Sequence, residues 1–232
     1  MSNEPKEYIA ITNPLGRVSI PESEEQTTKH RTSLFVTSDT ELMFDSEART
    51  MIRRDGLEDL LSFLHKTDFY YAPASTRYHG AKGGGLLEHS LSVYKWIFSI
   101  ADNPLLATDG GFYPEELTTE SMAIVSLFHD VCKINTYSID YKNAKNPETG
   151  AWERVPYFKM EDINGFGSHA ARSTYIIQQF MQLKEPEFIA ILHHMGAWDK
   201  STYSDPGRAY EKHPLSWVLH VADEAATYIS KK

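Results

Sequence analysis

A histidine–aspartate pair at the end of a mostly apolar stretch is the clearest chemical feature of the sequence. The stretch Ala123–Phe128 runs directly into His129 and Asp130. Burying a carboxylate beside apolar side chains is costly unless a partner compensates its charge. A metal ion would pair with both residues at once, because imidazole nitrogen and carboxylate oxygen suit ions such as Mn, Fe, Zn or Co. The chain contains ten histidines, so further ligands are available.

Four elements, taken in order, resemble the HD superfamily of metal-dependent phosphohydrolases. That family carries a His, then a His-Asp pair, then a distant Asp, each on a separate helix. Here His89 matches the first His, His129 and Asp130 match the pair, and Asp223 matches the last Asp. The resemblance extends over about residues 70–230. It implies an all-α fold, an HD-domain helical bundle, with one or two divalent metal ions such as Mn or Fe, or Mg.

Two further elements resemble the extended, two-metal form of the family. His169 lies in a Gly-Ser-His-Ala stretch, and His193 and His194 lie in Ile-Leu-His-His-Met-Gly. The resemblance implies that the first ion is held by His89, His129, Asp130 and Asp223. It also implies that Asp130 bridges to a second ion, held by His169 and one His of the doublet. The His-Met-Gly context favours His194 and the doublet of other HD families favours His193, so both stay open.

Basic residues close to these motifs are candidates for contact with substrate. Lys133 follows the His-Asp pair and is placed to meet a phosphate oxygen, so Asp130 and Lys133 are the catalytic candidates. The alternative for Lys133 is a cation that stabilises a helix C-terminus. Arg77, His79 and Lys82 precede His89 in a glycine-containing loop and are candidates for substrate binding. The glycines lack the Lys-Ser/Thr ending of a P-loop, so we interpret them as a turn before the His89 helix.

Two residues near the motifs favour structural interpretations. His220 lies three residues before Asp223, which suits support of a ligand or a plain packing role. Cys132 is interpreted as a small packing residue.

The composition is that of an ordinary globular protein. With 232 residues and 41% hydrophobic content, the chain can bury one substantial core. With a formal net charge of −9, the protein lacks the overall basic surface that is typical of proteins that bind long nucleic acid. A local basic patch is compatible with this charge. We therefore expect a small phosphorylated substrate, a nucleotide above all. No apolar run suits a membrane, the first residues are polar, and a single cysteine forms no internal disulfide, so a cytoplasmic location is expected.

Apolar spacing and turn residues predict the elements that must position these side chains. Helices are predicted at about residues 56–66, 86–102, 117–133, 168–183, 185–196 and 213–230. Alternation at Tyr8–Ile11, Arg17–Ile20 and Ser33–Val36 predicts a small, β-type N-terminal part. We expect residues 1–48 to form an N-terminal extension and residues 49–232 the HD domain.

The segment between the third and fourth predicted helices is aromatic and irregular. Tyr137–Tyr141 and Arg154–Phe158 could pair as a hairpin. Its aromatic residues could line a base-stacking pocket or form the core of the hairpin. These residues are Tyr137, Tyr141, Trp152, Tyr157 and Phe158.

The leading functional hypothesis is a metal-dependent phosphohydrolase that acts on a nucleotide or another phosphoester through metal-activated water. One alternative is a 3′-to-5′ exonuclease on single-stranded RNA or DNA, which requires a local basic groove. Another is a di-iron oxygenase on the same scaffold. A third is a nucleotide sensor without turnover, against which the intact ligand set argues.

Overall fold

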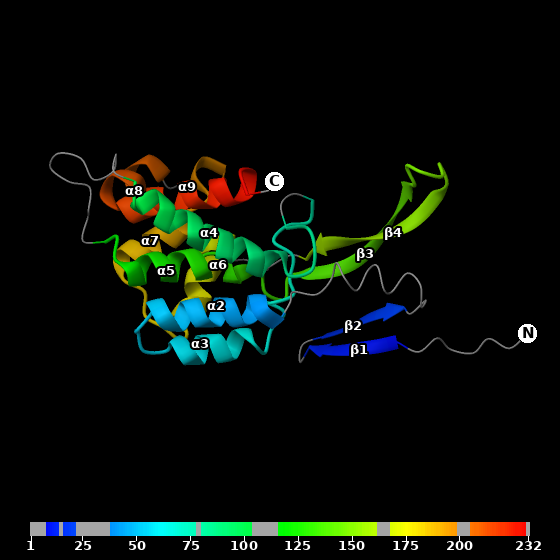
Figure 1. Ribbon diagram of the computed structural model, residues 1–232, viewed down its shortest axis with the longest axis horizontal. Coiled ribbons are helices and arrows are strands. Elements are labelled where there is room, and N and C mark those ends of the chain that lie inside the picture. The colour runs from blue at the N-terminus through cyan, green and yellow to red at the C-terminus, as the bar shows by residue number, and fades with distance from the viewer. Residues whose placement is uncertain are drawn as a thin grey trace, which may run out of the picture.

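A helical bundle forms most of the structure, and a long β-hairpin extends away from it (Figure 1). The computed structural model describes residues 8–13, 16–21, 38–77, 80–103, 116–161, 168–198 and 205–230. The elements are β1 (Tyr8–Asn13), β2 (Gly16–Pro21), α2 (Ser38–Met51), α3 (Leu57–Leu64), α4 (Gly85–Ala101), α5 (Thr119–Phe128), η2 (Val131–Lys133), β3 (Tyr137–Lys145), β4 (Trp152–Met160), α6 (His169–Gln178), α7 (Glu185–His193), η3 (Gly196–Trp198), α8 (Pro206–Lys212) and α9 (Pro214–Tyr228).

Four helices surround the main hydrophobic core. Helix α4 packs against α5 and α9, and α7 packs against α5 and α9. Helix α5 is buried on all sides from Ser121 to Phe128, whereas α9 buries a stripe at helical spacing that includes Leu215, Leu219 and Ala222. The predicted all-α fold is confirmed. Within the described residues, no helix combines the length and the apolar character that crossing a membrane requires.

Helix α2 is an element that the apolar spacing did not predict. Its sequence is largely polar, but Phe44 and Ala48 lie one turn apart and are fully buried. The Phe44 ring packs against Phe69 and Phe128, with centroids 5.2 and 5.8 Å apart. Because α2 crosses the predicted boundary after residue 48 and contributes to the core, we propose that the helical domain begins at or before residue 38.

Two other predicted helices differ from the structure. The helix predicted over 117–133 ends at Phe128, and a turn and the short helix η2 follow it. The Thr118 side chain caps its start by accepting a hydrogen bond from the Ser121 N–H. The helix predicted over 168–183 ends at Gln178, whereas the helix predicted over 213–230 is confirmed as α9, with a separate short helix, α8, before it.

The predicted strands form two antiparallel hairpins. Strand β1 pairs with β2 from Tyr8↔Pro21 to Asn13↔Gly16. Strand β3 pairs with β4 from Tyr137↔Met160 to Lys145↔Trp152, which confirms the predicted aromatic hairpin. The strand predicted at residues 33–36 lies outside the described residues.

A fully buried glutamate connects the starts of two helices. Glu187 accepts the backbone N–H of Lys184 at 2.7 Å and the Ser121 hydroxyl at 2.7 Å, which ties the first turn of α7 to the first turn of α5. Its charge is paired with Arg54, whose Nη2 lies 2.9 Å from Oε1. Arg54 also contacts Glu120 at 2.8 Å. This buried network fixes the N-terminal ends of α5 and α7. The C-terminal end of α5 leads into His129 and Asp130, and that of α7 leads into His194.

Candidate metal centre

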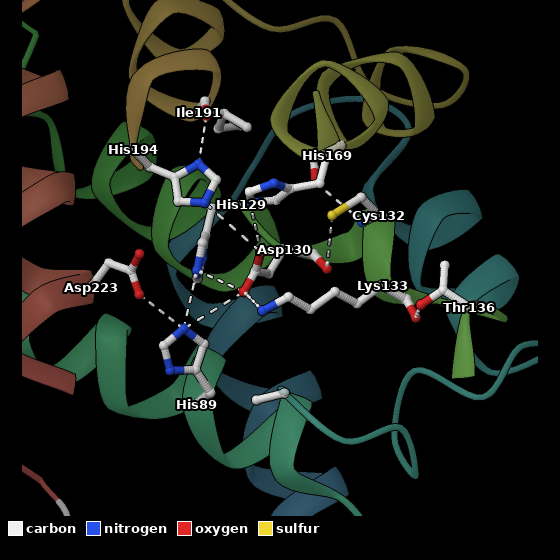
Figure 2. Close-up of polar contacts among 12 residues, drawn as sticks. His89, His129, Asp130, Cys132, Lys133, Thr136, His169, Ile191, His194 and Asp223 are labelled. Carbon is white, nitrogen blue, oxygen red and sulfur yellow. Dashed lines mark hydrogen bonds and ion pairs between the residues drawn. The ribbon is translucent and has the colours of Figure 1, made fainter. Parts of the chain in front are cut away.

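Five helical elements bring six of the predicted ligands to one place. His89 lies in α4 and Asp223 in α9, while His169 begins α6. His129 and Asp130 follow the end of α5, and His194 follows the end of α7. Figure 2 shows four imidazole rings directed toward the Asp130 carboxylate, with Asp223 beside His89. The residues form three overlapping groups that could each hold an ion: His89, His129 and Asp130; His129, His194 and Asp223; and Asp130, His169 and His194.

Glycines position the start of the helix that carries His89. Gly84 has a φ of 73°, a left-handed conformation that glycine adopts without strain. A Cβ on Gly85 would lie 2.0 Å from the Gly80 carbonyl oxygen, so only glycine allows this close approach. The Gly84 and Leu86 N–H groups donate to the Tyr71 and Ala72 carbonyls. The structure therefore agrees with the interpretation of this loop as a turn that precedes the His89 helix.

The side chains of His89, His129, Asp130 and Asp223 are closely spaced and buried. His89 Nε2 lies 3.0 Å from Asp223 Oδ1 and 3.3 Å from His129 Nε2. His129 Nε2 lies 3.4 Å from Asp130 Oδ2. His129 is fully buried, and His89 is 5% exposed. Two ring nitrogens and two carboxylates thus converge in a space shielded from water.

The group of Asp130, His169 and His194 leaves polar atoms without partners among the described residues. Asp130 Oδ1 lies 3.9 Å from His169 Nε2 and 3.8 Å from His194 Nε2, too far for hydrogen bonds. Asp130 Oδ1 and His194 Nε2 are both buried with no hydrogen-bond partner. Buried polar atoms are costly when left unsatisfied. A cation between these atoms would satisfy both, so the residues present fit a metal ion.

Backbone carbonyls orient two of the rings. His129 Nδ1 lies 2.9 Å from the Ser126 oxygen, and His194 Nδ1 lies 2.7 Å from the Ile191 oxygen. In each ring this contact favours the tautomer that donates from Nδ1, which leaves the Nε2 lone pair for a metal. Burial, together with the charges of His129 and His169, lowers the pKa of His194 to about 3. His194 is therefore neutral near pH 7, the form that binds metals.

Lys133 contacts the carboxylate at the centre of the site. Its Nζ lies 2.6 Å from Asp130 Oδ2, on the side opposite to the unpaired Oδ1 (Figure 2). Burial alone would raise the pKa of Asp130, but the charges of Lys133 and His129 hold that pKa well below its usual range. Burial would likewise lower the pKa of Lys133, and the Asp130 charge raises it instead. The pair is therefore charged near pH 7, and Asp130 keeps its negative charge for a cation.

The neighbours of these ligands have structural contacts. His220 Nδ1 lies 2.6 Å from the His194 backbone oxygen, and the His220 ring stacks on Tyr210 at 5.4 Å. Cys132 is buried, its N–H donates to Ser173 Oγ at 3.1 Å, and burial raises the pKa of its thiol to about 12. Both findings agree with the structural roles predicted for these residues.

The three ligand groups include none of the other predicted site residues that the structure describes. His193 is half-buried and belongs to none of the three groups, so we propose His194 as the ligand of the doublet. Lys82 forms an exposed ion pair with Glu88, with Nζ 2.8 Å from Oε2. Arg77 is exposed. His79 lies outside the described residues. Substrate contacts of Arg77, His79 and Lys82 remain predictions.

The fold and the site define a helical protein with a buried histidine–aspartate cluster suited to a metal. The family model described as the HD domain matches residues 86–228, more than half of the chain, and the chain belongs to this family. HD domains bind divalent metals, and the family indicates activity of the metal-dependent phosphohydrolase type. Neither the curated proteins nor the solved structures contained a match to this chain.

Metal binding at this site is expected to raise thermal stability. A ligand present at 100 times its Kd and bound only by the folded state adds about 2.7 kcal/mol. For a chain of this size, that gain corresponds to a Tm increase of roughly 5–10 °C. Differential scanning fluorimetry of chelator-treated protein with added Mn²⁺ checks this. An equal Tm increase in the Asp130→Asn variant would show that Mn²⁺ binds at another site.

Proposed function

We propose that this protein hydrolyses a phosphoester, with a nucleotide as the preferred class of substrate. The observation that carries the proposal is the Asp130 carboxylate, with Oδ2 held by Lys133 and Oδ1 facing His169 and His194 without a hydrogen-bond partner in the described chain. This arrangement suits a cation beside Asp130 Oδ1 and an anion, such as a phosphate, beside the Lys133 ammonium. When bound, divalent metal ions lower the pKa of water and neutralise phosphate charge.

The side chains of this protein supply position and charge. We propose that His89, His129, Asp130 and Asp223 hold one ion, and that Asp130, His169 and His194 hold a second. The buried His129 and Asp130 exclude bulk water from the inner side of the site. His169 is more accessible, with 29% of its side chain exposed, and marks the side from which substrate enters. Lys133 keeps its proton and directs a positive charge toward the phosphate oxygens.

Hydrolysis of a substrate panel tests the proposal. The panel contains nucleoside mono-, di- and triphosphates, cyclic nucleotides, short oligonucleotides and bis-p-nitrophenyl phosphate. With Mn²⁺, Fe²⁺ or Mg²⁺ present, p-nitrophenol is measured by absorbance, and phosphate, nucleosides and nucleoside monophosphates are measured by chromatography. We expect turnover that a chelator abolishes and the metal restores. Absence of turnover on every member by metal-loaded protein would overturn the proposal.

Replacing Lys133 by methionine is expected to lower kcat/KM by roughly 10- to 100-fold. Methionine keeps most of the side-chain volume but removes the charge, and a hydrogen bond from a charged group contributes about 1.5–3 kcal/mol. Steady-state kinetics on the best substrate of the panel measures the change. Lys142→Met, an exposed lysine on β3, is the matched control and should keep wild-type kinetics. Equal kinetics for the two variants would show that Lys133 does not take part in catalysis.

A further inference from the structure

The β3–β4 hairpin has two chemically different faces. Residues that pair across antiparallel strands share a face, and alternate residues along each strand point to the same side. The register therefore places ten residues on one face: Tyr137, Ile139, Tyr141, Asn143, Lys145, Trp152, Arg154, Pro156, Phe158 and Met160. None of them is acidic, and five are aromatic or proline. We call this set the aromatic–basic face.

The outer half of this face is exposed to solvent. Trp152 is 72% exposed and Tyr141 is 39% exposed. The Arg154 guanidinium lies over the Tyr141 ring, 4.9 Å from its centroid, a cation–π arrangement that holds both groups in place. Lys145 pairs with Trp152 across the strands and is also exposed. Two cations thus lie beside two exposed aromatic rings, and Arg154 covers one face of the Tyr141 ring.

The opposite face balances its own charges. It carries Asp140 and Glu153 together with Lys142 and Lys159. The Tyr157 hydroxyl donates to Asp140 Oδ2 at 3.3 Å, and Lys142 lies 5.4 Å from the Tyr157 ring centroid. This face carries two acidic and two basic side chains and so has no net charge. The positive charge of the hairpin is therefore concentrated on the aromatic–basic face, in a chain whose net charge is −9.

The base of the hairpin is joined directly to the metal centre. Lys133, which contacts Asp130, is four residues before Tyr137 in the chain. The Thr136 hydroxyl donates to the Lys133 carbonyl at 2.7 Å, and the Tyr137 hydroxyl donates to the Ala74 carbonyl at 3.3 Å. The hairpin thus begins four residues after Lys133 in the chain and extends away from the helical bundle (Figure 1).

We propose that the aromatic–basic face binds single-stranded nucleic acid, with bases stacked on Trp152 and Tyr141 and phosphates beside Lys145 and Arg154. Exposed aromatic rings alternating with cations are the combination that binds single strands without sequence preference. A second copy of the chain fits less well, because a symmetric contact of this face with itself would bring together cations with no acidic partner. The delivery of a strand end to the metal centre rests on the proposed function, whereas binding to the hairpin does not.

Fluorescence anisotropy of a labelled twelve-nucleotide oligodeoxythymidine tests the binding. A phosphorothioate backbone slows hydrolysis, so the full chain can be used with Mn²⁺ bound. We expect saturable binding by the wild type at low salt. Trp152→Ala should weaken it roughly 5- to 100-fold, the range found when one stacked base loses its aromatic partner. Arg154→Ala should also reduce the slope of log K against log salt by about 0.7, the loss of one phosphate contact with a single strand.

Two variants serve as matched controls. Trp198 is 71% exposed and lies outside the hairpin, so Trp198→Ala should leave binding unchanged. Lys142→Ala removes the same charge from the opposite face and should change the affinity less than threefold. Equal weakening by Trp198→Ala, or no saturable binding by the wild type, would overturn the proposal. So would a concentration-dependent dimer in size-exclusion chromatography that Trp152→Ala abolishes, because the face would then be an interface between copies.

Failure of this proposal and failure of the proposed function give different results. Asp130→Asn should lose hydrolysis and keep oligonucleotide binding. Trp152→Ala should weaken oligonucleotide binding and keep hydrolysis of bis-p-nitrophenyl phosphate. If the wild type hydrolyses the small ester but binds no oligonucleotide, only the hairpin proposal is wrong. If it binds the oligonucleotide through Trp152 but hydrolyses nothing, only the proposed function is wrong.

Discussion

Asp130→Asn is expected to reduce kcat by more than about 1000-fold and to abolish stabilisation by Mn²⁺, because a neutral amide cannot provide the charge that both proposed ions share. The carboxylate is approached by four imidazoles and one ammonium, from His89, His129, His169, His194 and Lys133. The substitution keeps the size of the side chain. Turnover and metal content, measured by mass spectrometry of the purified protein, are the readouts.

The loss must be separated from a general folding defect. Asp130→Asn also leaves the Lys133 ammonium without its counter-ion. A double variant that combines Asp130→Asn with Lys133→Met removes both charges of the pair and so avoids this defect. Asp45→Asn is a matched control outside the site, since Asp45 is 8% exposed and bonded to His65 and Tyr70. Asp45→Asn should retain turnover even where its Tm falls. If Asp130→Asn retains wild-type metal content, Asp130 is not a ligand.

Glu187→Ala is expected to destabilise the fold by about 3–5 kcal/mol, the usual cost of removing one partner from a buried ion pair. The change leaves Arg54, the Ser121 hydroxyl and the Lys184 N–H without the carboxylate that they share. For a domain of this size, the expected Tm decrease is roughly 6–20 °C. Chemical denaturation followed by circular dichroism gives the free energy of unfolding.

The exposed Arg49–Glu58 pair provides the comparison. Its Nε–Oε1 distance of 2.9 Å resembles those of the Glu187 network, but 68% of the Glu58 side chain is exposed. Exposed pairs contribute about 0–1 kcal/mol, so Glu58→Ala should hardly change stability. Equal effects of Glu58→Ala and Glu187→Ala would show that burial of the network is not what stabilises the two helix starts.

The ligand cluster was predictable because its residues break the local pattern. Asp130 follows an apolar stretch, and such a charge requires a partner. The choice between His193 and His194 was not predictable, because consecutive residues on a helix point about 100° apart and the end of α7 decides which ring faces Asp130. The geometry of the ligand cluster was not predictable from local spacing either, because it depends on packing among helices that are far apart in the sequence.

Other parts of the fold gave weaker signals. Helix α2 has few apolar residues, so its burial through Phe44 and Ala48 depends on neighbours that local spacing does not contain. Glu187 lies in a first helical turn with Glu185, where acidic residues are usually exposed, and nothing local distinguishes the buried one. By contrast, local alternation predicted β1 and β2 as strands, and the two strands of the aromatic hairpin were predicted as partners.

The burial of Cys132 makes the protein suited to site-specific labelling. The chain has no other cysteine, and a thiol whose pKa is raised to about 12 forms little thiolate near pH 7. A cysteine introduced by Glu148→Cys at the exposed tip of the hairpin would then be the reactive thiol of the molecule. One fluorophore or spin label placed there would report the movement of the hairpin tip directly, without first removing a native cysteine.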